Sequence, residues 1–100
     1  MVAGLQRPDL FLVARLLENL EHLGGRSRPT GLQLASAINY TQLERYLAFL
    51  DARGLVALST GENGATWVAI TPKGREALLY LARAIRDGLR QEFSRSRTEP

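Results

Sequence analysis

The feature of this sequence that most constrains its fold is a capping pattern that occurs twice, nine residues apart. Thr30 is followed by Gln33, and Asn39 by Gln42. In such a pattern the first side chain accepts a hydrogen bond from the third helical N–H, while the glutamine reaches back to the first residue. Each pattern therefore predicts the start of a helix. Because the two starts are so close, we predict two short helices joined by a tight turn at Ile38, which is a helix-turn-helix.

The second of these helices has an apolar face and a polar face. Its predicted buried stripe, at helical spacing, consists of Leu43, Tyr46, Leu47 and Leu50. The opposite face carries Thr41, Arg45, Ala48 and Ala52, with Gln42 and Glu44 on its flanks. Small residues around one arginine suit a helix that enters the major groove of duplex DNA. An ordinary solvated face has the same composition, and the position within a helix-turn-helix favours the first interpretation.

An earlier helix is predicted to begin at Asp9, which is well placed as an N-cap, and to end at Gly24-Gly25. Its buried stripe is predicted to consist of Leu10, Val13, Leu16, Leu17, Leu20 and Leu23. The inward-facing residues of the short helix after Thr30 are predicted to be Leu32, Ala35 and, as a further candidate, Leu34. These faces would pack together as one three-helix core.

A β-hairpin is predicted after the third helix. Residues 55–59 and 65–71 have the composition of strands, and Asn63-Gly64 between them is a strong signal for a two-residue hairpin turn. Trp67 is expected to pack at the base of this hairpin, the wing. Because the wing tip carries Glu62 and neither lysine nor arginine, we expect at most a contact from Asn63 to a sugar edge there.

The last predicted helix begins with Thr71 as its cap and Pro72 at its first position, and it extends to Phe93. It would be roughly 30 Å long at about 1.5 Å per residue. Its apolar stripe consists of Leu78, Leu81, Ala82, Ile85, Leu89 and Phe93. A three-helix core can cover only the first part of such a helix. We therefore predict an antiparallel coiled coil with the same helix of a second copy.

The composition excludes several classes of function. The chain has no cysteine, which excludes disulfides, thiol catalysis and thiolate metal sites. His22 is the single histidine, and no Gly-rich phosphate loop, metal-ligand cluster or nucleophile motif accompanies it. We therefore predict no enzymatic activity, no cofactor and no metal. No apolar run is long enough to span a membrane, and the first residues lack the pattern of a signal peptide, so a cytoplasmic location is expected.

The charge of the chain favours a polyanionic partner. The formal net charge is +3, the pI is about 10.0, and Lys73 is the only lysine among 13 basic residues. Arginine forms bidentate contacts with phosphate and with guanine, although a GC-rich genome or a heat-adapted surface would explain the arginines equally well. Four of them are predicted to form one patch with the exposed face of the third helix: Arg26, Arg28, Arg45 and Arg53. Pairing of these four with acidic residues of the chain would contradict DNA binding.

Two segments carry a resemblance to a known family, AINYTQLERYLAFLDARGLV at residues 37–56 and ITPKGR at residues 70–75. With its capped helix, its Leu-x-x-Tyr-Leu-x-x-Leu spacing and its Ile-Thr-x-Lys-Gly motif, the chain resembles the small archaeal winged-helix DNA-binding proteins, over about residues 10–90. The resemblance implies an antiparallel coiled-coil dimer with the third helix in the major groove. The acidic wing tip and the single lysine depart from a chromatin-type protein and favour a selective regulator. The groove-facing residues carried over are Tyr40, Thr41, Gln42, Glu44 and Arg45.

The sequence thus predicts an α+β fold, with a winged helix-turn-helix at residues 8–72, a dimerisation helix at 73–93 and a disordered tail at 94–100. The predicted function is sequence-selective or architectural binding of double-stranded DNA by a homodimeric, nucleoid-associated transcriptional regulator. The alternative is a protein-contact module of a larger assembly that does not bind DNA. The predicted DNA contacts are Arg26, Arg28, Thr30, Tyr40, Thr41, Gln42, Glu44, Arg45 and Asn63. The predicted dimer contacts are Leu78, Leu81, Ile85, Leu89 and Phe93.

Overall fold

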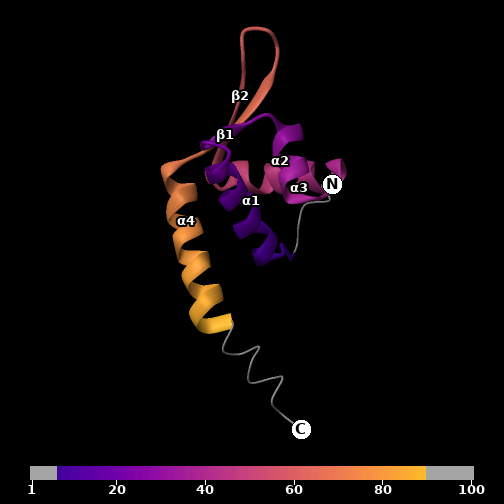
Figure 1. Cartoon of the computed structure of the whole chain (residues 1–100). Coiled ribbons are helices and arrows are strands. Elements are labelled where there is room, and N and C mark those ends of the chain that lie inside the picture. Colours follow the sequence, from indigo (N-terminus) through magenta and orange to yellow (C-terminus); the bar gives the residue numbers. More distant parts are fainter. Residues whose placement is uncertain (1–6, 90–100) are drawn as a thin grey trace.

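A computed structural model describes residues 7–89 of the chain. Helices α1, α2 and α3 form the body of the molecule, the β2–β3 hairpin projects from it, and α4 runs alongside α1 (Figure 1). In chain order the elements are α1 (Leu10–His22), β1 (Arg26–Ser27), α2 (Pro29–Ser36), α3 (Tyr40–Ala52), β2 (Val56–Thr60), β3 (Thr66–Ile70), α4 (Pro72–Arg83) and the π-helical turn η1 (Ala84–Leu89).

Three of the predicted helix caps are confirmed. The Asp9 carboxylate accepts hydrogen bonds from two backbone N–H groups in the first turn of α1. The Asn39 side chain accepts from the backbone of Gln42 at 2.7 Å, and the Thr71 hydroxyl accepts from the backbone of Gly74 at 2.9 Å. Each cap satisfies donors that the helix itself leaves unpaired, which is why helices α1, α3 and α4 begin where the sequence predicts.

The predicted cap of α2 at Thr30 is wrong. The helix begins two residues earlier, at Pro29, and Arg28 occupies the N-cap position without a side-chain hydrogen bond. Proline favours the first helical position because its φ is already helical and it has no N–H to satisfy. At the other end of α2, Ala37 adopts the left-handed conformation with φ 56°, and Ile38 packs against the core as expected for this turn.

The core lies between the three helices and the inner face of the sheet. Two predicted core positions of α1, Leu10 and Leu23, are exposed, because they stand at the ends of the helix, and Leu12 and Ala14 are buried instead. The buried hydrophobic residues are Leu12, Val13, Ala14, Leu16, Leu17, Leu20, Leu32, Leu43, Tyr46, Leu47, Leu50, Val56, Val68 and Ile70.

The buried face of α2 also differs from the prediction. Leu32 is buried as expected, but Ala35 is exposed and Leu34 is 79% exposed. The reason lies in α1, where the Asn19 side-chain amide donates to the Ser36 hydroxyl at 2.9 Å and to a backbone carbonyl at 3.3 Å. This polar contact turns the Ser36 side of α2 toward α1, because a buried hydroxyl needs a hydrogen-bond partner.

The sheet contains one strand that the sequence did not predict. Its order is β1-β3-β2 and both pairings are antiparallel, with β1 only two residues long. The two strands of the wing lie within a residue of their predicted ends. A two-residue strand is too short for an alternating pattern to be recognised in the sequence.

The wing turn is not the predicted two-residue turn. The backbone N–H of Gly64 donates to the carbonyl of Gly61 at 3.0 Å, and the N–H of Gly61 donates to the carbonyl of Ala65 at 2.6 Å. Within the loop Gly64 has a positive φ, 82°, whereas Asn63 does not. This is the geometry of a three-residue loop with a type I turn followed by a left-handed glycine.

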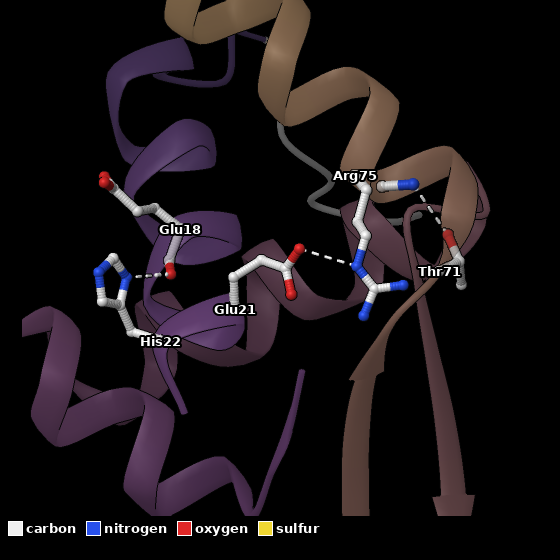
Figure 2. A network of polar contacts seen from close by, with 6 residues as sticks. Glu18, Glu21, His22, Thr71 and Arg75 are labelled. Carbon is white, nitrogen blue, oxygen red and sulfur yellow. Dashed lines mark hydrogen bonds and ion pairs between the residues drawn. The ribbon is translucent and has the colours of Figure 1, made fainter. Parts of the chain in front are cut away.

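Helix α4 is fixed to the body of the molecule at its first turn. The Thr71 hydroxyl donates to the Gly54 carbonyl at 2.6 Å, and Gly74 is the buried residue of the helix. Figure 2 shows Arg75 pointing at the carboxylate of Glu21 in α1, with a nitrogen–oxygen distance of 2.7 Å. These contacts hold α4 beside α1.

The remainder of α4 departs from the predicted regular helix. The α-helix ends at Arg83 and is followed by the π-helical turn η1, so the long coiled-coil helix is not seen within residues 7–89. Ala82 is exposed. Leu78 and Leu81 pack against the chain's own core, as expected for the first part of the helix, and their contact with a second copy stays a prediction. The side chain of Leu89 and the whole of Phe93 lie outside the described residues, as does the predicted tail.

Candidate nucleic-acid interface

Helix α3 presents the predicted polar face to solvent. All four residues of its apolar stripe are buried, and this fixes the rotation of the helix about its axis. Tyr40 is 50% exposed, and Gln42 is partly buried at the flank of the face. The exposed residues of the opposite face are Thr41, Glu44, Arg45, Ala48 and Ala52. We call Tyr40, Thr41, Gln42, Glu44 and Arg45 the recognition face.

Contacts from distant parts of the chain hold α3 in this orientation. The hydroxyl of Tyr46, on the buried side, accepts a hydrogen bond from the backbone N–H of Asp9 at 2.9 Å. This bond joins the start of α1 to the middle of α3. At the C-terminal end, and within α3 and its cap, the Arg53 guanidinium lies 4.0 Å from the centre of the Phe49 ring. The Tyr46 hydrogen bond and the buried stripe anchor α3 to the core, and the recognition face is displayed on the opposite side.

Arg26, Arg28 and Thr30 lie on the segment that enters α2. Arg26 belongs to β1, Arg28 occupies the N-cap position of α2, Thr30 is in its first turn, and all three are exposed. Both arginines lie over the ring of Trp67, with distances to its centre of 4.1 Å for Arg26 and 5.7 Å for Arg28. The structure thus gathers these two arginines on one aromatic side chain, which the sequence analysis did not foresee.

Trp67 does not lie at the base of the wing. It pairs with Ser59, and only the pair Thr60–Thr66 lies between it and the turn. Its side chain is half-buried, and a Cβ on Gly61 would lie 3.2 Å from the indole nitrogen. The predicted position at the base of the hairpin is therefore wrong.

The arginines of the predicted patch are not neutralised internally. Within residues 7–89 the one ion pair joins Arg75 to Glu21, so Arg26, Arg28, Arg45 and Arg53 have no acidic partner there. The outcome that would have contradicted DNA binding is therefore absent from this part of the chain. Arg26 and Arg28 lie on Trp67 of the wing, whereas Arg53 lies at the C-terminal end of α3. That these three and Arg45 form one continuous patch stays a prediction.

Other side chains singled out by the sequence have local roles. The side-chain oxygen of Asn63 accepts from the backbone of Ala65 at 3.2 Å and so supports the wing turn. His22 lies with its Nδ1 3.0 Å from the Glu18 carbonyl, a contact within one turn of α1 (Figure 2). In the described part of the chain no three His, Asp or Glu side chains are grouped as metal ligands. No helix between residues 7 and 89 has the length and apolarity to cross a membrane.

The architecture matches solved structures. Sso10a-2 of Sulfolobus solfataricus, described as a DNA-binding protein, has a TM-score of 0.76 and 23% identity over 91% of this chain and 90% of its own. F93 from STIV, a winged-helix DNA-binding protein, has a TM-score of 0.72 and 15% identity over 80% of this chain and 92% of its own. The chain has a winged-helix fold. This confirms the part of the predicted fold class that names an α+β winged helix.

Regulators share this winged-helix domain as part of longer chains. The transcriptional regulator BldR of Sulfolobus solfataricus has a TM-score of 0.71 and 22% identity over 84% of this chain, which spans 60% of BldR. No protein-family model and no curated protein sequence matches the chain. At these identities the likeness shows the fold, and the function has to be argued from the residues.

Proposed function

We propose that this winged-helix chain binds double-stranded DNA and acts as a transcriptional regulator. The observation that carries the proposal is the recognition face of α3, where Arg45 stands exposed and unpaired with any acidic residue between 7 and 89. Thr41 precedes it by one helical turn, and Ala48 is small enough to allow a close approach. Such a face fits a major groove, in which arginine donates two hydrogen bonds to one guanine.

The proposed contacts divide into base and backbone contacts. Arg45, Gln42 and Glu44 would meet base edges, because the first half of a recognition helix lies deepest in the groove. Glu44 would accept from the amino group of cytosine, since a carboxylate cannot approach phosphate favourably. The backbone contacts would come from Arg26, Arg28 and Thr30 at the start of α2, with Asn63 at a sugar edge.

The names of the solved structures with a similar fold support this proposal. Sso10a-2 and F93 are called DNA-binding proteins, and BldR is called a transcriptional regulator. None of these three names describes an enzyme, which agrees with a non-catalytic role. A protein that binds DNA in this way would be associated with the nucleoid.

Titration of a random-sequence duplex at several salt concentrations tests the proposal. The two arginine–phosphate contacts of each bound protomer would contribute about −2 to the slope of log affinity against log salt. For one bound protomer, affinity should then fall roughly 12-fold between about 50 and 200 mM salt. Fluorescence anisotropy of a labelled duplex measures this directly. Absence of binding at the lowest salt would reject the proposal.

The alternative function is a protein contact. Leu34 on α2 is 79% exposed, which is unusual for a large apolar side chain beside a DNA-binding helix. A winged helix used as a subunit of a larger assembly would place such a residue in an interface. This alternative is favoured if the duplex titration shows no binding.

We also propose that two copies associate through α4. Leu79 and Tyr80 are 71% and 74% exposed on this helix, so it carries apolar surface that its own core does not cover. Ile85 in η1 is only half-buried. An isologous pairing of two such helices would bury these side chains, which is the commonest symmetry among soluble oligomers. The two recognition faces would then act on one duplex together.

Replacement of Ile85 by glutamate is expected to convert a dimer to monomers at micromolar concentration. The charged side chain would have to be buried without a partner in the apolar contact. Sedimentation velocity measures the change. Lys73→Glu, at the exposed start of α4, alters charge at the other end of the helix and should leave association intact. A wild-type chain that sediments as a monomer would contradict the proposal.

A further inference from the structure

The outer face of the wing sheet carries three side chains that the recognition helix does not use. In β3, Val68 and Ile70 point into the core, so Trp67 and Ala69, which alternate with them, lie on the opposite, outer face. In the neighbouring strand β1 the same alternation buries Ser27 and exposes Arg26. We call Arg26, Arg28 and Trp67 the indole cluster.

Arg28 joins this face because its backbone is still extended. Its φ of −71° and ψ of 151° continue the strand conformation for one residue beyond β1, before α2 begins. Arg26 and Arg28 therefore project to the same side of the segment, where both guanidinium groups lie within about 6 Å of the Trp67 ring, the range of a cation–π contact. The arrangement follows from the sheet pairing and not from the spacing of the arginines alone.

Stacking leaves both guanidinium groups able to bind anions. A guanidinium that lies on a ring uses its flat face, while its five N–H donors point outward in its plane. Two positive charges beside one ring repel each other, and no carboxylate within residues 7–89 pairs with either. The cluster is therefore a preformed site for a partner with more than one negative charge.

We propose that the indole cluster grips the phosphate backbone of the duplex that the recognition helix enters, with Trp67 as the positioning residue of the two arginines. This inference rests on the proposed DNA binding. The duplex backbone is the anion that fits, because β1 leads directly into α2 and the hairpin rises beside it (Figure 1). The wing thus meets DNA mainly along its stem, and the acidic side chain of Glu62 at its tip does not take part.

Positioning by Trp67 has a thermodynamic consequence. A mobile arginine loses rotamer freedom when a phosphate immobilises it, whereas a stacked arginine has lost part of that freedom already. Without the ring, both arginines would have to be ordered on binding. We expect Trp67→Leu to weaken duplex binding about tenfold.

The experiment uses the full chain and a labelled random-sequence duplex over a series of salt concentrations. Anisotropy is measured for wild type, Trp67→Leu, Trp67→Phe and the Arg26→Ala/Arg28→Ala double variant. It is also measured for the double variant that carries Trp67→Leu in addition. Trp67 is the single tryptophan of the chain, so its emission reports on the cluster alone. Arg15→Ala, which removes one arginine charge from an exposed position of α1, is the control for charge loss away from the cluster.

The proposal expects five results. Duplex changes the Trp67 emission, Trp67→Leu weakens binding, and Trp67→Phe recovers part of the loss because its ring still offers a weaker cation–π contact. The double variant lowers the steepness of the salt dependence by about 2, at about 0.9 for each lost phosphate contact. When both arginines are already absent, Trp67→Leu causes no further loss of duplex affinity. If the ring had only a structural role, Trp67→Leu would weaken binding in that chain as well.

Two results would overturn the inference while DNA binding stands. The first is wild-type binding without any change in emission. The second is an undiminished effect of Trp67→Leu in the chain that lacks both arginines. Circular dichroism shows whether Trp67→Leu folds. If it does not, the salt dependence of the double variant decides whether the cluster binds phosphate, because both arginines are exposed and their replacement should leave the fold intact. Failure of the wild type to bind any duplex would instead reject the proposed function itself.

Discussion

Replacement of Gly74 by alanine is expected to lower the free energy of unfolding by about 3 kcal/mol. A Cβ built on Gly74 would overlap the carbonyl oxygen of Leu55 and lie 2.9 Å from Cγ1 of Ile70. The first of these neighbours is backbone, held in place by a hydrogen bond from the Thr71 N–H to the same oxygen at 3.2 Å. Neither group can move without disturbing the junction of α4 with the sheet, so the added methyl group has to displace the helix.

Urea unfolding followed by circular dichroism measures this loss. Gly88→Ala is the matched control, because a Cβ there has no neighbour within 4 Å and alanine is the better helix former by up to about 1 kcal/mol. The control should be neutral or stabilising. Equal stability of Gly74→Ala and the wild type would show that α4 docks differently from the arrangement described above. The same close approach explains why a glycine follows Lys73 in the Ile-Thr-x-Lys-Gly motif.

Replacement of Arg45 by alanine is expected to cost about 1–3 kcal/mol of binding free energy on a preferred duplex, and little on other sequences. Arg45 is exposed in the middle of α3, on the recognition face that the buried stripe fixes toward solvent. If its guanidinium donates two hydrogen bonds to a guanine, only duplexes with that guanine lose affinity. The folded structure should be unaffected, because the side chain has no hydrogen-bond partner to lose within residues 7–89.

Selection from a random duplex pool supplies the preferred sequence, and anisotropy on that sequence and on a scrambled one measures the difference. Arg15→Ala should reduce the two affinities little and equally, since it lies on α1. An equal, large loss on both sequences for Arg45→Ala would assign this residue to a phosphate. That result would leave DNA binding in place but remove Arg45 from sequence recognition.

The recognition helix was predictable because its determinants are local. A cap needs one side chain and a backbone N–H two or three residues away, and Asp9, Asn39 and Thr71 meet this requirement within their own segments. The apolar residues of α3 recur about every 3.6 residues, so they form one stripe along the helix. Burial of that stripe against a core fixes the rotation of the helix about its axis. The predicted exposure of the recognition face therefore agrees with the structure.

The features that were missed depend on neighbours far along the chain. Ser36 is buried because Asn19 donates to it, 17 residues away, and hydrophobicity alone had suggested Leu34. Leu78 and Leu81 were predicted as dimer contacts, and both pack against the chain's own core. In both cases the side chain's surroundings are set by another helix, which an amphipathic pattern does not specify.

The sequence by itself determined the starts of α1, α3 and α4, the rotation of α3 and the presence of the hairpin, since hydrogen bonds and periodicity within a few residues decide them. The tertiary structure alone decided that Arg26–Ser27 forms a strand beside β3 and that two arginines meet on Trp67. The pairing of two residues with a strand some 40 positions later has no local signature, because its energy comes from the partner strand and the core beneath it.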